Sequence, residues 1–266
     1  AIPNFILKLV TGGNPSEALI RHGLLPDMVG LAATIVVFLV VVYAESMRIE
    51  LPLSYGRVRG AKGRYPIRFV YVSNIPVILA VALFQNVRLW SLLLHKVDFP
   101  WSHLLGNWQQ TEHGLDLVGG LAYYLSSPPK VYLPGVLAEQ WLHILIYIVS
   151  MLIACVIFGI LWVDITGMGP KQVAKQLQQA GMQIPGFRRD IRVMERVLSR
   201  YIPVITIISS LFVGALAAFA DIWGALGTGT GILLTAGIVY RLYEEIAREQ
   251  FTEMFPAVRK FIGAEY

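Results

Sequence analysis

The amino-acid sequence predicts an all-α fold: a polytopic bundle of transmembrane helices rather than a soluble domain. The first observation is composition, since 56% of the residues are hydrophobic and only 15% are charged, whereas soluble domains carry roughly a quarter charged residues. The second is that apolar residues form uncharged runs close to the ~20 residues that a helix needs to cross the bilayer core. The third is that Lys and Arg gather in alternate connections between those runs.

Five apolar segments meet or approach the length of a membrane span. They cover about residues 26–47, 69–94, 141–163, 201–220 and 227–243. The second segment is interrupted by Asn74, Pro76 and Gln85, and the fifth is short and rich in glycine. We therefore expect residues 1–266 to form one domain with five spans.

The basic residues give the five spans an orientation. Of the 22 Lys and Arg residues, 17 lie after the first, third and fifth spans, and five lie in the remaining connections. Because positive charge accumulates on the cytosolic side, the connections at 48–68 and 164–200 and the C-terminus are predicted to be cytosolic. We expect a multi-pass protein of the cell (plasma) membrane, with residues 95–140 outside.

The external connection is too long for a simple hairpin. It contains Trp, Tyr and an apolar patch at 115–125, which favours an interfacial or partly re-entrant segment. A sixth full span is the alternative, although the patch is shorter than the ~17 residues that a span needs.

The two cytosolic connections carry different signals. In the first, Gly alternates with Arg and Lys, which predicts an exposed basic hairpin at 55–66. The second is predicted to begin as an amphipathic helix near Lys171 and to turn at Pro185 and Gly186. A second helical stretch at 190–200 then leads into the next span.

No catalytic constellation is found in the sequence, so we expect no enzyme activity, no metal site and no cofactor. The five histidines lack the H-x-x-x-H spacing of a metal-binding helix. The sequence GTGTG at 227–231 lacks the Lys of a phosphate loop. It is instead expected to begin a helix whose small residues pack closely in lipid. Charged residues near the middle of the spans are nearly absent, which disfavours an ion-coupled carrier.

Two features each allow two interpretations. Asn and Gln at membrane depth cost free energy unless they meet a partner or water, so those of the second span either hold helices together or line an aqueous path. The basic connections either only fix the topology or also dock an anionic partner. Phosphate-rich RNA and anionic lipid headgroups are both suitable partners.

Three stretches of the sequence resemble the SecY family of protein-conducting channel subunits, in its archaeal form. They are ESMRIELPLSYGRVRGAKGRYPIRFVYVSNIPVILAVALFQN at 45–86, IPGFRRD at 184–190 and GTGTGILLTAGIVYRLYEEI at 227–246. Family members have ten spans in two pseudo-symmetric halves, so the resemblance implies a C-terminal half with spans six to ten. The start at Ala1, without Met or signal-peptide features, agrees with a chain from within a longer protein.

The resemblance also implies roles for individual residues. An apolar ring that closes the pore would include Ile78, two residues after Pro76, together with Leu234 and, as a weaker candidate, Ile75. The polar seam of the lateral gate would include Asn74 and Gln85. The docking surface for a ribosome or another motor would include Arg57, Arg59, Lys62, Arg64, Arg188 and Arg189.

The function implied is that of half a channel, which moves secretory polypeptides across the membrane and releases transmembrane segments laterally into lipid. The implied partners are the N-terminal half of the channel, a SecE-type subunit, a small SecG or Sec-beta-type subunit, a ribosome or other motor, signal sequences with their nascent chains, and the bilayer. The alternatives are a secondary transporter with a broken helix at Pro76 and, less favoured, an intramembrane enzyme.

Overall fold

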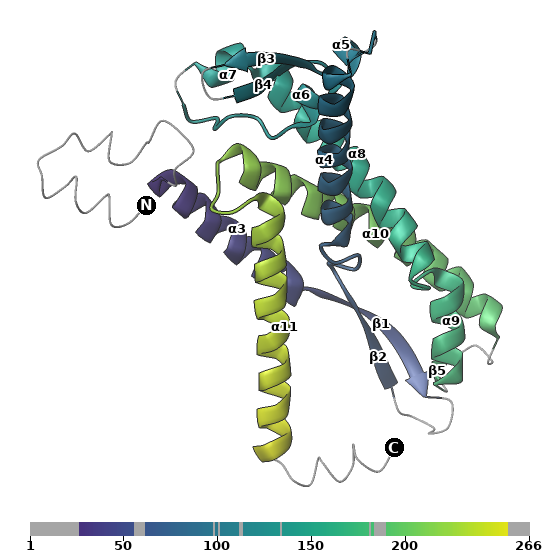
Figure 1. The fold of residues 1–266 in the computed structure, drawn as a ribbon. Helices are drawn as coiled ribbons and strands as arrows, with labels where there is room; N and C mark the ends of the chain where they lie inside the picture. Colours follow the sequence, from purple (N-terminus) through teal and green to yellow (C-terminus); the bar gives the residue numbers. More distant parts are fainter. Residues whose placement is uncertain are drawn as a thin grey trace, which may run out of the picture.

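Five long helices form the frame of the described part of the chain (Figure 1). A computed structural model describes residues 27–55, 62–97, 99–100, 102–111, 114–133, 135–180, 182–183 and 190–254. The long helices are α3 (Met28–Ser46), α4 (Ile75–Lys96), α8 (Trp141–Ile165), α10 (Ile191–Ile222) and α11 (Gly229–Met254). Four short helices connect them: α5 (Ser102–Leu105), α6 (Leu121–Leu125), α7 (Val136–Glu139) and α9 (Pro170–Gln179).

Small residues bring the long helices into close contact. Helix α10 packs along α8, α8 packs on α4, and α11 packs on α3. A methyl group added at Gly214 of α10 would lie 3.0 Å from the Cys155 sulfur of α8. Residues such as Met151 and Ala217 are fully buried between these helices. Close approach of this kind supplies the dispersion contacts that hold helices together when lipid surrounds them.

The outer faces of the helices are apolar as well. Leu39 of α3 is 61% exposed and Ile153 of α8 is 56% exposed. Among the described residues, four stretches are long and apolar enough to cross a membrane: α3, α4, the stretch that begins with α8, and α10. Helix α11 lies outside that set because charged residues, beginning with Arg241, occupy its second half.

Helix α4 begins later than the apolar run that contains it. The backbone turns at residues 71–74, where Ser73 has a φ of 58°, and the helix starts at Ile75. Pro76 therefore lies in the first turn, where a missing N–H group leaves no bond unmade. The proline starts this helix instead of breaking it.

Helix α10 joins two segments that the sequence analysis treated separately. The predicted cytosolic helix at 190–200 and the predicted span at 201–220 form one helix of 32 residues, which runs through Pro203. The amphipathic helix expected near Lys171 is α9. Its buried residues Val173 and Leu177 pack in one cluster with Leu198 of α10.

The first connection that is predicted to be cytosolic is a β-hairpin, as expected, with strands that extend beyond the predicted 55–66. Strand β1 (Arg48–Tyr55) pairs with β2 (Lys62–Arg68) from Arg48 opposite Arg68 to Ser54 opposite Lys62. Strand β5 (Met182–Gln183) of the second connection pairs with the far end of β1. The two connections that are predicted to be cytosolic thus share one small sheet, in the order β2-β1-β5.

The described residues of the connection that is predicted to be external fold into several short elements. Strands β3 (Asn107–Thr111) and β4 (Gly114–Gly119) form a hairpin, which α6 follows. The predicted apolar patch at 115–125 is therefore divided between a strand and a helix at Gly120, whose φ is +89°. This division excludes the alternative of a sixth full span. Trp108 of β3 ties the hairpin to α4, because its Nε1 donates to the Ser91 hydroxyl at 2.9 Å.

Candidate functional site

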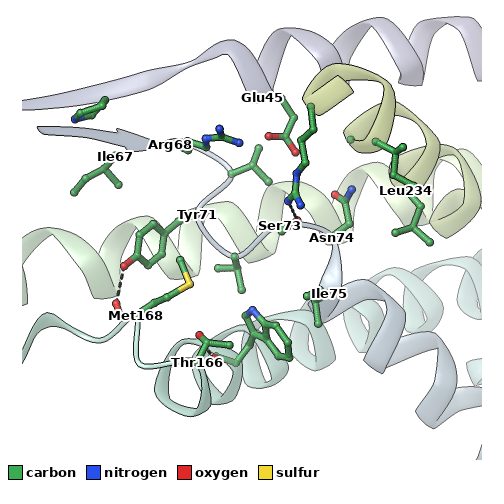
Figure 2. Close-up of a pocket in the computed structure, with 17 residues that line it drawn as sticks. Glu45, Ile67, Arg68, Tyr71, Ser73, Asn74, Ile75, Thr166, Met168 and Leu234 are labelled. Atoms are coloured by element: carbon green, nitrogen blue, oxygen red, sulfur yellow. Dashed lines mark hydrogen bonds between the residues drawn. The ribbon is translucent and has the colours of Figure 1, made fainter. Parts of the chain in front are cut away.

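A cavity of about 590 Å³ lies where the hairpin base meets the long helices. Figure 2 shows its lining, which comes from the end of α3, the end of β2, the start of α4, the end of α8 and the middle of α11. The turn between β2 and α4, residues 69–74, contributes Tyr71, Ser73 and Asn74 to the lining. We call this turn the connector.

Two aliphatic side chains that the resemblance assigns to the pore ring line this cavity together. Ile75, the first residue of α4, and Leu234 of α11 both belong to the lining (Figure 2). Ile78 lies on the next turn of α4, outside the lining, and is 37% exposed. The structure therefore brings Ile75 and Leu234 to one cavity. Ile78 lies on α4 like Ile75, but outside the cavity lining.

Asn74 joins the start of α4 to α11. Its side chain is 5% exposed, and its Nδ2 donates to the Leu233 carbonyl at 2.7 Å. Gly237 makes room for this contact, since a methyl group there would lie 2.8 Å from Nδ2. For Asn74 the structure supports the interpretation that a polar side chain holds two helices together.

Gln85 occupies a different place. It is exposed on α4 and lines a second cavity of about 430 Å³ with Arg88, Asp116 and His143. Eleven residues of helix separate it from Asn74, which corresponds to about 16 Å. The two residues assigned to the lateral gate therefore lie at separate cavities, Asn74 at the start of α4 and Gln85 near its middle.

Ionic and polar contacts at one edge of the first cavity connect the hairpin and the connector to α11. Arg241 donates to the Ser73 hydroxyl at 2.8 Å. The Glu244 carboxylate accepts from Arg48 through one oxygen and from Arg68, at 2.9 Å, through the other. Glu45 lies beside this network at 2% exposure, and one of its carboxylate oxygens has no hydrogen-bond partner among the described residues.

Most of the predicted docking residues fall outside the described part of the chain. These are Arg57, Arg59, Arg188 and Arg189. Lys62 and Arg64 belong to β2, where their backbones pair with Ser54 and Pro52, and their side chains also lie outside the described residues.

The sequence analysis did not identify Arg241 and Glu244 as site residues. Their signal is the spacing of three on a helix, which places both on one face. The function of that face depends on its contacts with hairpin residues Arg68 and Arg48, which lie 176 and 196 positions away from Glu244 in the sequence.

At the opposite end of α3, an acidic side chain ties the helix to the external connection. Asp27 caps α3 by accepting from the Gly30 N–H at 3.2 Å, and it also accepts from Lys130 at 3.1 Å and from the Tyr132 hydroxyl. Burial alone would raise the pKa of Asp27, but these hydrogen bonds and the Lys130 charge outweigh it and lower that pKa. Burial and the neighbouring carboxylate raise the pKa of Tyr132.

No metal site accompanies these clusters. Within the described ranges, no three His, Cys, Asp or Glu side chains come together in a way that could hold a metal ion. The paired charges around the first cavity are suited to positioning helices. Its aliphatic side chains are suited to lining a path.

Comparison with known proteins decides the family. The SecY family profile matches residues 1–243. The chain belongs to the SecY family. The protein translocase subunit SecY of Pyrococcus horikoshii is 50% identical over 98% of this chain and 53% of its own length. That of Methanocaldococcus jannaschii is 50% identical over 88% of this chain and 51% of its own length.

Solved structures agree with the assignment to the SecY family. One described as the structure of a protein conducting channel matches with a TM-score of 0.74 and 46% identity, over 97% of this chain and 56% of that chain. A chain of the idle yeast Ssh1 complex bound to the 80S ribosome shares the fold, with a TM-score of 0.61 and 20% identity over 88% of this chain and 48% of that chain.

These findings confirm both the SecY resemblance and the expected helical membrane bundle. The chain spans about half the length of the curated SecY relatives that it matches. Nothing in them supports a secondary transporter with a broken helix at Pro76, and Pro76 lies in the first turn of α4.

Proposed function

We propose that this chain supplies one half of a protein-conducting channel in the cell membrane, with its hairpin on the cytosolic side. The channel passes secretory polypeptides and releases transmembrane segments laterally into lipid. The observation that carries the proposal is membership of the SecY family over most of the chain. The cavity lined by Ile75 and Leu234, next to the base of a basic hairpin, supports it.

The aliphatic residues around the cavity form this half's share of the pore constriction. Ile75, Ile78 and Leu234 present apolar side chains from α4 and α11, and both Ile78 and Leu234 are 37% exposed. Apolar constrictions block ions by excluding water, while they deform around a larger apolar or extended solute. In the complete channel the other half supplies the opposite side of the ring.

Helix α4 serves as one wall of the lateral gate. Asn74 and Gln85 mark polar positions at its start and near its middle, and the apolar side chains between them include Leu79 and Leu83, which are 37% and 45% exposed. An apolar signal segment that binds better to the open arrangement shifts the gate toward opening.

The cytosolic sheet is the docking surface for a ribosome or another motor. Its β2-β1-β5 order supports this role, since it joins strands of the two connections whose sequences carry the basic residues Arg57, Arg59, Lys62, Arg64, Arg188 and Arg189. The remaining partners are the N-terminal half of the channel, a SecE-type subunit, a small SecG or Sec-beta-type subunit, signal sequences, nascent chains and lipid.

Ion conductance of the complete channel tests the constriction. Ile78→Gly combined with Leu234→Gly is expected to raise resting conductance in planar bilayers several-fold, because two apolar side chains are removed from the ring. Val239→Gly, at a position of α11 that is 45% exposed and outside the cavity lining, is the matched control. Unchanged conductance in the double variant would remove the pore-ring assignment.

A further inference from the structure

We propose that Glu244 is a positioning residue that fastens the base of the basic hairpin to α11. The hairpin and α11, which carries Leu234, then move as one unit. A force applied to the hairpin is therefore transmitted through α11 to the proposed pore constriction. The mechanical link is a property of the fold, whereas its effect on the channel rests on the proposed function.

The hairpin base needs a negative charge to close. Arg48 and Arg68 are direct cross-strand partners, and like charges in that position destabilise a strand pair. Each of the two donates to a different oxygen of the same Glu244 carboxylate. A single acidic side chain of α11 therefore bridges both arginines, reduces their mutual repulsion and joins the first residue of β1 to the last residue of β2.

Burial distinguishes Glu244 from its neighbour. The Glu244 side chain is 20% exposed, and its two arginine partners are 43% and 42% exposed. Glu245, the next residue, is exposed. The helix thus offers an internal comparison between a glutamate that faces the hairpin and one that faces away from it.

Further contacts extend the attachment along the same face of α11. Asn74 donates to the Leu233 carbonyl, and Arg241 donates to Ser73. Positions 233, 237, 241 and 244 follow the spacing of four, four and three that places residues on one helix face. From Leu233 to Glu244 the attachment covers about 16 Å of helix.

The hydrogen-bond partners of Glu244, Arg241 and the Leu233 carbonyl named above belong to the hairpin base or the connector. Leu234, adjacent to Leu233, lies at the N-terminal end of the attached stretch and lines the cavity with Ile75. A displacement of the hairpin therefore acts on α11 over the same three turns that present the proposed ring residue. Without Glu244, Arg48 and Arg68 lose the ionic contact with α11 that they share.

Amide hydrogen exchange in the complete channel, reconstituted in lipid nanodiscs, tests the link without any ligand. Glu244→Gln is expected to speed exchange of backbone amides at 48–51 and 67–69 by roughly two- to fivefold, the range that a partly exposed ion pair can supply. Glu245→Gln is expected to leave these amides unchanged. If Glu244→Gln exchanges like the unmodified channel, the proposal is overturned.

Charge exchange separates an ionic link from a loss of packing. The triple variant Arg48→Glu, Arg68→Glu, Glu244→Arg keeps one charge between two of the opposite sign and is expected to restore slow exchange. The double variant Arg48→Glu, Arg68→Glu, which leaves three acids together, is expected to exchange fastest. Fast exchange in the triple variant would overturn the assignment of Glu244 as an ionic fastener.

Conductance in the presence of empty ribosomes tests the transmission. Glu244→Gln is expected to bind ribosomes as tightly as the unmodified channel while its ribosome-induced change in conductance falls two- to fivefold. An unaltered response in a variant whose hairpin exchanges fast would overturn the transmission. If ribosomes do not bind even the unmodified channel, the docking function fails, and the exchange experiment still decides whether the link exists.

Discussion

The Asp27 carboxylate accepts three hydrogen bonds at the start of α3, the end that is predicted to be external. It satisfies an N–H group of the first helical turn, receives Lys130 and binds the Tyr132 hydroxyl. Helix caps and charge-assisted hydrogen bonds contribute about 1–3 kcal/mol each when they are buried. The external connection is therefore attached to α3 through a group whose charge state matters.

Acid titration of stability checks this residue. Because the pKa of Asp27 is lowered from its ordinary value of 3.8, its ionised form stabilises the folded state above that value, and the contribution is lost as the pH falls through the lowered pKa. We expect Asp27→Asn to reduce the free energy of unfolding by about 1–3 kcal/mol at neutral pH. The difference from the unmodified chain should shrink below about pH 4.

Thermal unfolding in detergent between pH 3 and pH 7 measures both effects. Asp116→Asn is the matched control, because Asp116 is an exposed acid of the same external side. A constant difference between Asp27→Asn and the unmodified chain across that range would contradict the role of the Asp27 charge.

At the scale of elements, hydropathy located the helices better than it located their ends. The apolar run from residue 69 suggested an earlier start for α4, but the left-handed backbone at Ser73 delays it to Ile75, and a positive φ at serine has no sequence signature. Helix α11 continues to Met254, eleven residues past the predicted span. The reason is that Arg and Glu are good helix formers, although they disfavour a lipid environment.

The external hairpin was missed for a related reason. Its strands are short and contain Gly114 and Gly119, so the alternation that marks a strand is weak. The hydrogen bond that attaches this hairpin joins Trp108 to Ser91 of α4. Sequence periodicity describes neighbours along the chain, and this contact depends on neighbours in space.

Trp108→Phe tests that tie, since it keeps an aromatic ring and removes the N–H donor. Loss of one buried hydrogen bond costs about 1 kcal/mol, so limited proteolysis within the external hairpin should become about fivefold faster. Trp90→Phe, at a site of α4 that is 65% exposed, is the control. Equal cleavage rates in the two variants would show that the Trp108 indole N–H does not anchor the hairpin.

The docking surface can be tested by its dependence on salt. Arg57→Glu, Arg59→Glu and Arg188→Glu together are expected to weaken ribosome binding by more than tenfold and to flatten its salt dependence, because contacts with phosphate release counterions. Lys96→Glu, on the side predicted to be external, is the control. Binding that is unaffected by the triple reversal would exclude these residues from the docking surface.

At the scale of the whole molecule, the chain is a framework with much apolar surface left uncovered. Trp90, Leu93, Leu142 and Ile238 are each between 44% and 65% exposed. Lipid, the other half of the channel and the small subunits are the surfaces that we expect to cover them. The fold class could be predicted because it depends on composition, which is a property of whole segments.

The candidate site was predictable only in part. The family resemblance placed Ile75 and Leu234 at the pore, and the structure brings them to one cavity. It could not place Glu244 between Arg48 and Arg68, because that contact depends on the relative position of a hairpin and a helix at opposite ends of the chain.

The pairing of β5 with the far end of β1 has a consequence for how such a chain can change in length during evolution. Arg48 is held by Glu244 at one end of β1, while Ser54 is held opposite Gln183 at the other. A single residue inserted between them would turn every later side chain of the strand to the opposite face or pull Arg48 away from α11. Insertions and deletions should therefore be rare between positions 48 and 54.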